Sequence, residues 1–283
     1  MSISTIEERW LVLLYRHCRS HFQEVFLPSH NHQHHLRVWY YAKELIHALS
    51  EHGIPFPDTL IEEIMFAIFF HDVGMSVTMG ENHGKISADL FQAFMTDKET
   101  QTDANREAIY LAIRNHDRKN YDEVSFEVAV ERKNILPAVV NISDDLDAFG
   151  YTGVYRYLEI YLLREVHPDL LAGKISENLS RRFSNLSFTM GKIARFVEKH
   201  KIRYQQAIGF FKALSETGYI PDKELSGPSG VVSLVRDLVI GQKNDLNEII
   251  ESQKIPKHDG YIQEFLQHYR AEANRFAPLY PDL

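Results

Sequence analysis

Apolar residues recur at helical spacing along almost the whole chain, and few segments break the pattern. Val38, Ala42, Leu45 and Leu49 stand at i, i+4, i+7 and i+11 within residues 33–51, which places them on one face of an α-helix. The same spacing predicts further helices at residues 5–26, 59–73, 83–96, 104–116, 135–150, 151–166, 174–186, 188–216, 231–252 and 259–276. The pattern therefore predicts an all-α fold.

Residues 59–73 are apolar on nearly every side, so this helix should lie at the centre of the fold. Thr59 followed by Glu62 has the spacing of a capping box at the helix start, and Gly74 follows its end. Two segments depart from the helical pattern. Residues 124–130 alternate and are typical of a short strand or a loop, and residues 218–230 are rich in Gly, Pro and Ser.

Composition bounds the class of protein. A chain of 283 residues with 44% hydrophobic residues can bury a large core without disulfides. The single cysteine, Cys18, excludes a disulfide framework, and its place on an apolar helix face favours a core thiol over a nucleophile. The length favours one large domain or two small ones.

Charge and local sequence also exclude several functions. The net charge of −8 argues against bulk nucleic-acid binding. We find no membrane-spanning apolar stretch and no signal-peptide pattern at the polar N-terminus, so we expect a cytoplasmic protein without a membrane partner. We find no phosphate-binding Gly-rich loop, dinucleotide fingerprint or nucleophile elbow.

Six potential metal ligands fall on the apolar faces or at the ends of five predicted helices. They are His34, His71, Asp72, His83, His116 and Asp144. His34 lies four residues before Val38, and Asp144 lies four residues after Val140. A single histidine of this kind is most often a half-exposed helix-end residue. A His-Asp pair closing the apolar run FAIFFHDVG is harder to explain that way, because a buried unpaired charge is costly. A shared metal site explains all six.

In this order the residues resemble the HD-domain metal-dependent phosphohydrolases. The resemblance covers about residues 31–150 and rests on five segments: HHLRV (34–38), FFHDVG (69–74), NHGKISADLF (82–91), IRNHD (113–117) and SDDLDAFG (143–150). It implies an HD-domain helical bundle over residues 1–150. Residues 151–283 would then be a C-terminal helical extension that covers or shapes the active site.

The resemblance is to the branch of the family with both extra histidines, which implies two metals. Asp72 would bridge them, His34, His71 and Asp144 would hold one, and His83 and His116 the other. Asp145 would replace Asp144 if the register were off by one. Such ligands suit Fe, Mn, Ni, Zn or Mg.

The resemblance also suggests catalytic residues beside the bridging Asp72. His30-Asn31 before His34 resembles the His-Asn-x-x-His segment of cyclic-nucleotide phosphodiesterases, in which the first His donates a proton to the leaving oxygen. The alternative is that His30 is a solvated helix-start residue. Met75 stands after HDVG, where several two-metal members carry a phosphate-contacting Lys, and Lys85 could supply that charge instead.

Five basic residues are candidates for contacts to the substrate: Arg37, Arg118, Lys119, Arg181 and Arg182. Arg37 follows the first ligand within HHLRV, whereas Arg181 and Arg182 can bind phosphate with bidentate bonds. Solvated surface positions are the alternative for the basic residues outside HHLRV. Tyr151, Tyr155 and Tyr157 would line the pocket or pack into the core.

The expected function is hydrolysis of a phosphate ester in a small molecule or nucleotide by a metal-activated water. A diiron oxygenase with the same ligand set is the first alternative. A non-catalytic regulatory module stabilised by metal is the second. Because soluble oligomers are often twofold, a homodimer is compatible with the sequence.

Overall fold

The structure is a computed structural model that describes residues 3–97, 102–117, 124–220, 226–251 and 260–275. These residues form helices and no strands, which confirms the all-α fold. They divide into two compact units. The first contains the described residues up to Asp147 together with Asn185–Val197, and the second contains Ala148–Ser184 and the described residues from Glu198 onward. Residues 185–197 thus belong to the first unit, although the sequence places them in the C-terminal extension.

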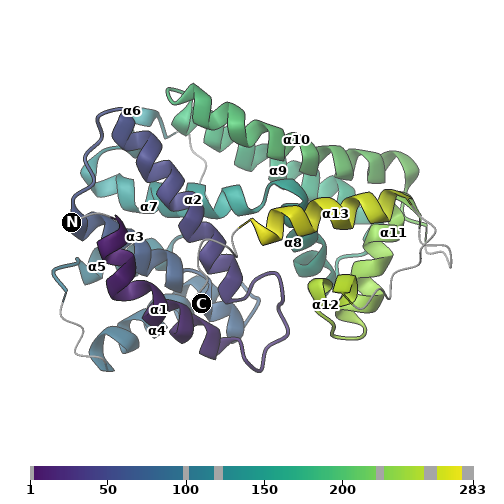
Figure 1. The fold of residues 1–283 in the computed structure, drawn as a ribbon, viewed down its shortest axis with the longest axis horizontal. Helices are drawn as coiled ribbons and strands as arrows, with labels where there is room; N and C mark the ends of the chain where they lie inside the picture. Colours follow the sequence, from purple (N-terminus) through teal and green to yellow (C-terminus); the bar gives the residue numbers. More distant parts are fainter. Residues whose placement is uncertain (1–2, 98–101, 118–123, 221–225, 252–259, 276–283) are drawn as a thin grey trace. The chain divides into compact units, whose positions relative to one another are not determined.

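The first unit is built from the N-terminal helices. They are α1 (Ile3–His21), α2 (His32–Glu51), α3 (Asp58–Phe70), the 3-10 helix η1 (Val73–Ser76), α4 (His83–Asp97), α5 (Arg106–Arg114), α6 (Phe126–Ala129) and α7 (Arg132–Asp147). As its all-round apolar sequence predicts, α3 is central and packs against α1, α2, α4, α5 and α7 (Figure 1). Ten of its 13 residues are buried.

The predicted capping box at the start of α3 is wrong. The helix begins one residue earlier, at Asp58, after Pro57, which makes no side-chain cap. The Glu62 carboxylate instead accepts hydrogen bonds from the Trp10 indole nitrogen and the Thr102 hydroxyl. The Glu62 side chain therefore bonds to residues that are distant in the sequence and does not cap its own helix as the capping box predicts.

Residues 124–130 contain the short helix α6, so the predicted strand or loop is wrong. The Ser125 hydroxyl caps this helix by accepting from the Val128 backbone nitrogen. Lys192 pairs with Glu127 and lies 5.7 Å above the Phe126 ring. No strand among the described residues is present to pair with the alternating pattern.

Two helix contacts in the first unit position the candidate site. Helix α2 packs against α7 (Figure 1), so His34 and Arg37 face Asp144 and Asp147 across their contact. Helix α4 packs against η1 and α5. The backbone nitrogen of Gly74 donates to the Ser87 hydroxyl at 2.8 Å in this contact.

The second unit contains α8 (Gly150–Leu163), α11 (Gly227–Leu234), the π-helix η2 (Val235–Ile240), α12 (Leu246–Glu251) and α13 (Gly260–Asn274). Helices α9 (Pro168–Met190) and α10 (Ala194–Thr217) contain residues of both units. The single helix predicted over residues 231–252 is wrong. Its hydrogen bonding changes to the π pattern at Val235, and a turn containing Lys243 at φ +53° separates η2 from α12.

The three tyrosines of α8 pack against aromatic side chains of the second unit. Tyr151 stacks on His268 with ring centroids 4.7 Å apart. Tyr155 makes an edge contact with Tyr269 at 5.2 Å, and Tyr157 makes one with Phe211 at 6.3 Å. Among the described residues, no helix is both long and apolar enough to cross a membrane.

Candidate metal centre

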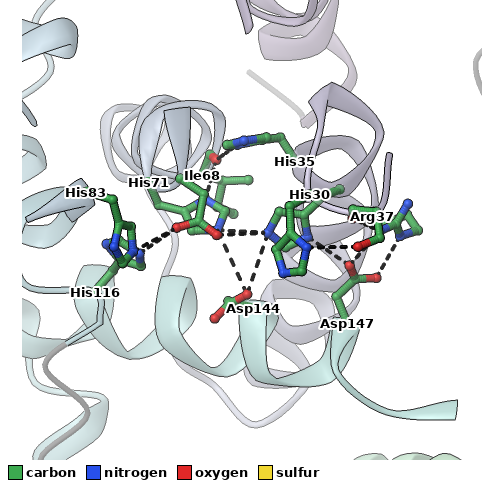
Figure 2. A network of polar contacts seen from close by, with 12 residues as sticks. His30, His35, Arg37, Ile68, His71, His83, His116, Asp144 and Asp147 are labelled. Carbon is green, nitrogen blue, oxygen red and sulfur yellow. Dashed lines mark hydrogen bonds and ion pairs between the residues drawn. The ribbon is translucent and has the colours of Figure 1, made fainter. Parts of the chain in front are cut away.

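The structure brings all six predicted ligands together in the first unit. Three of them come from helices: His34 from α2, Asp144 from α7 and His83, which is the first residue of α4. His71 and Asp72 lie between α3 and η1, and His116 lies in the turn after α5. All six residues are between 0% and 8% exposed. In Figure 2, His83 and His116 lie on one side of the cluster and Asp147 and Arg37 on the other.

Four residues form the first group, which we call site A: His34, His71, Asp72 and Asp144. The Nε2 atoms of His34 and His71 lie 3.2 Å apart. His34 Nε2 lies 3.5 Å from Asp72 Oδ2 and 3.7 Å from Asp144 Oδ1. Atoms bound to one ion at about 2.0–2.1 Å lie about 2.9–3.5 Å apart. Site A is therefore close to the size of a coordination sphere.

The second group, site B, consists of Asp72, His83 and His116. Asp72 Oδ1 lies 3.3 Å from His83 Nε2 and 2.9 Å from His116 Nε2. The other oxygen of the same carboxylate, Oδ2, faces site A. Asp72 thus stands between the two groups, which is the position of a bridging ligand.

The hydrogen bonds of the four imidazoles show that the residues fit a metal. Each ring is engaged at Nδ1, and the acceptors are Asp147 Oδ2 for His34, Ile68 O for His71, Gly80 O for His83 and Ile113 O for His116. An imidazole that donates from Nδ1 presents a lone pair at Nε2. In both sites these lone pairs converge with carboxylate oxygens. A cation between them would satisfy these buried acceptors.

The electrostatics of the cluster favour the ligand forms of two residues. Burial lowers the pKa of His71 to about 4, so its imidazole stays neutral. Burial by itself would raise the pKa of Asp72, but the neighbouring His71 and the polar contacts with His116, His34 and His83 hold it well below its usual value. Burial opposes charge on His83 too, yet the Asp72 carboxylate raises the pKa of His83 to about 9.

The predicted proton donor His30 lies at the edge of site A. It is 7% exposed, and its ring centroid is 5.7 Å from that of His34. The Ser29 hydroxyl contacts His30 Nδ1 at 2.8 Å. His30 is therefore buried beside the first metal ligand and not a solvated residue at the helix start.

The basic residues predicted to contact substrate or to act in catalysis occupy different places. Arg37 forms a bidentate ion pair with Asp147 at 2.8 and 2.9 Å. Lys85 has an exposed side chain and pairs with Asp89 one turn along α4, so the structure does not bring it into the cluster.

The other four candidates lie elsewhere in the chain. Arg181 and Arg182 belong to the second unit, where Arg181 donates to Asn178 Oδ1 and Arg182 lies 5.9 Å above the Tyr157 ring. Arg118 and Lys119 lie outside the described residues.

The geometry bears on two alternatives that the sequence leaves open. Asp145, the alternative to Asp144, is fully buried but belongs to neither ligand group. Cys18 is fully buried, and burial raises the pKa of its thiol well above its usual value. A buried neutral thiol packs as an apolar group and is a poor nucleophile.

Two polar residues of the site escape the sequence analysis. Asp147 accepts from His34, and His35 donates from Nδ1 to Ile68 O, the carbonyl that also accepts from His71. Asp147 follows Asp144 by three residues, so it shares a helix face with that ligand. That spacing is the signal that could have revealed it.

Comparison with known families agrees with this geometry. The family model of the HD domain matches residues 31–149, a range that contains all six clustered residues and runs from the N-cap of α2 to just beyond α7. No curated protein and no solved structure matches the chain significantly. The match shows that residues 31–149 are similar to the HD domain, which belongs to a superfamily of metal-dependent hydrolases, and the paired His/Asp groups are compatible with the metal site of that domain.

Proposed function

We propose that the protein is a phosphohydrolase that uses two divalent metal ions to cleave a phosphate ester in a small molecule or nucleotide. The observation that carries the proposal is the pair of adjoining buried ligand groups that share Asp72. A site with two neighbouring ions and a common carboxylate is suited to in-line displacement at phosphorus. The ions expected with His and Asp ligands are Fe, Mn, Ni, Zn or Mg.

When bound, such ions make water a nucleophile at neutral pH and offset the negative charge that builds on the phosphoryl oxygens. The residues of the chain supply orientation. Asp72 presents one oxygen to each site. The Nδ1 hydrogen bonds of His34, His71 and His116 hold the three rings with Nε2 directed inward.

His30 is the candidate general acid. The contact between its Nδ1 and the Ser29 hydroxyl fixes the ring, and Nε2 is the nitrogen that would carry the transferable proton. As water attacks phosphorus and the ester P–O bond breaks, His30 Nε2 would give this proton to the leaving oxygen and become neutral. General acid catalysis of this kind is typically worth about 10²–10⁴ in rate.

Contacts to the substrate remain predictions. Lys85, Arg118, Lys119, Arg181 and Arg182 are the candidate basic residues, and a phosphorylated small molecule or nucleotide is the expected partner. Whether the ester is a monoester or a diester is decided by the substrate panel below.

The first test is the metal content of protein purified without chelator, measured per chain by elemental mass spectrometry. The second is a panel of nucleotides, p-nitrophenyl phosphate and bis(p-nitrophenyl) phosphate. Two redox-inert or uniformly oxidised ions per chain with phosphate-ester hydrolysis would support the proposal. A mixed-valent diiron centre that consumes dioxygen, or a metal-loaded protein that hydrolyses none of these esters, would overturn it.

His30→Asn separates the role of this residue from that of the metals. The variant should keep its metal content and lose about 10²-fold in kcat on an alkyl phosphate ester. It should lose much less on a p-nitrophenyl ester, because that leaving group needs no proton. Equal losses on both esters would exclude a general acid role for His30.

A further inference from the structure

Among the four histidines of the metal centre, His34 has a different Nδ1 partner from the other three. His71, His83 and His116 engage backbone carbonyl oxygens. His34 engages a carboxylate oxygen, Asp147 Oδ2, at 2.8 Å. Hydrogen bonds to an ionised acceptor are roughly twice as strong as those to a neutral one. A carboxylate acceptor also makes the opposite ring nitrogen a better metal ligand.

Asp147 is held in place by a second bond system. Its side chain is fully buried, and its two oxygens accept from Arg37 Nε at 2.8 Å and Arg37 Nη2 at 2.9 Å. The bidentate geometry fixes the plane of the carboxylate. Arg37 and His34 are one turn apart on α2 and Asp147 is on α7, so the three groups join the two helices that carry ligands of site A.

Arg37 also reaches the turn that carries the candidate general acid. Its Nη2 donates to the Ser29 carbonyl oxygen at 3.2 Å, and the Ser29 hydroxyl contacts His30 Nδ1. One guanidinium therefore links Asp147, on the far side of His34, to the residue before His30.

We propose that Asp147 and Arg37 are positioning residues that orient and polarise His34 and thereby make site A the tighter of the two metal sites. Arg37 acts through Asp147 and Ser29 in this proposal and not by binding the substrate. The proposal rests on the metal centre of the proposed function, but it does not depend on which reaction that centre performs.

A purely structural role for the pair makes a different prediction. A buried ion pair that only holds α2 against α7 would affect the stability of the metal-free protein and leave metal affinity to the ligands themselves. Metal affinity measured apart from activity therefore separates the two roles.

The test is a titration of metal-free protein with Zn²⁺ in competition with a chromophoric chelator. We call the more tightly bound of the two Zn²⁺ ions the tighter equivalent. In Asp147→Asn we expect the affinity for this ion to fall by about 10–100-fold, the range for substitutions of residues that hydrogen-bond to metal-bound histidines. Asp117→Asn is the matched control, because Asp117 Oδ2 lies 3.9 Å from His83 Nδ1, beyond hydrogen-bond distance. Its tighter equivalent should stay within about threefold of the wild type.

The tighter equivalent can be assigned to a site by the nitrogen resonances of the histidine rings. In the wild type, the first equivalent of Zn²⁺ should shift the signals of His34 and His71 before those of His83 and His116. First shifts at His83 and His116 would overturn the proposal, as would an unchanged affinity in Asp147→Asn.

Removing one partner of a buried ion pair can unfold a protein, so a second variant is needed. Replacing both partners with apolar residues is often neutral or stabilising. Arg37→Met/Asp147→Leu should therefore stay folded without metal, although His34 Nδ1 loses its acceptor, and should still lose affinity for the more tightly bound Zn²⁺. Wild-type affinity in this folded double variant would overturn the proposal. A protein that binds two Zn²⁺ with the predicted order but hydrolyses no ester would overturn the proposed function alone.

Discussion

A Cβ atom on Gly74 would lie 2.2 Å from the backbone carbonyl oxygen of His83. The same atom would lie 2.8 Å from the backbone nitrogen of Ser87. Gly74 therefore lets η1 approach the first turn of α4, and that turn carries a ligand of site B. Gly74 thus has two roles. It follows the end of α3, and it allows the close contact with the turn that carries His83.

Gly74→Ala should weaken site B and destabilise the first unit. The backbone of α4 cannot yield as a flexible side chain would, and overpacking of this kind typically costs about 1–3 kcal/mol. Thermal unfolding and a Zn²⁺ titration measure the two effects. Gly173→Ala is the control, because a Cβ there meets nothing within 4 Å and alanine is the better helix former. Wild-type values for both measurements in Gly74→Ala would contradict the interpretation.

Substitution of the acidic ligands should change the metal count in a graded way. Asp72→Asn removes a carboxylate from both sites and should lose both ions, with kcat/KM falling by at least about 10²-fold. Asp144→Asn should lose the ion of site A and keep about one per chain. Asp145→Asn, the matched control at the neighbouring buried acid, should keep both ions. Elemental mass spectrometry gives the counts, and a loss in Asp145→Asn with none in Asp144→Asn would reverse the assignment.

Metal removal should lower the melting temperature reversibly. A ligand at about 100 times its Kd stabilises the native state by about 2.7 kcal/mol. For a unit of this size that corresponds to a shift of about 5–10 °C. Calorimetry before chelation, after chelation and after Zn²⁺ is restored measures the change. The same cycle should leave the melting temperature of Asp72→Asn unchanged, and a similar shift in that variant would place the stabilising ions elsewhere.

Acid should destabilise the second unit through His200. Burial and the neighbouring Arg203, Lys199 and Arg275 lower the pKa of His200 to about 2. Below about pH 6.5, His200 takes up a proton in the unfolded chain but stays neutral in the native protein. The free energy of unfolding therefore falls as the pH falls. This stability is fully present above about pH 6.5. The His200 contribution to the slope is at most about 1.4 kcal/mol per pH unit.

Urea unfolding between about pH 7 and pH 5 tests this contribution. His200→Phe should show a shallower loss of stability with acid than the wild type. His167→Asn, at an exposed histidine of the second unit, should keep the wild-type slope. Parallel curves for His200→Phe and the wild type would show that His200 does not cause the acid sensitivity.

The sequence predicts the six clustered residues because each lies on a periodic apolar face or at a helix end. An all-round apolar α3 also has to be central, since no side of it suits water. Local spacing is sufficient for such features. Local spacing cannot predict the hydrogen-bond partners of Glu62, because the Trp10 indole and the Thr102 hydroxyl come from positions 52 and 40 residues away.

The roles of Arg37 and Asp147 could not be predicted for a similar reason. Each lies three residues from a ligand, but they are 110 residues apart in sequence. Only the packing of α2 against α7 shows that the Arg37 guanidinium meets the Asp147 carboxylate. The alternation in residues 124–130 is misleading because seven residues are too few to separate a strand from a single helical turn.

The shared carboxylate of Asp72 has a thermodynamic consequence for loading. In the two-metal centre that we propose, the two oxygens of Asp72 face different sites, so occupancy of one site would change the charge and the freedom of a ligand of the other. The sites are then linked by a coupling free energy, and linkage requires that each ion alter the affinity for the other by the same factor. A titration analysed as two independent sites would misstate both dissociation constants, and the metal that fills the first site would influence which metal the second selects.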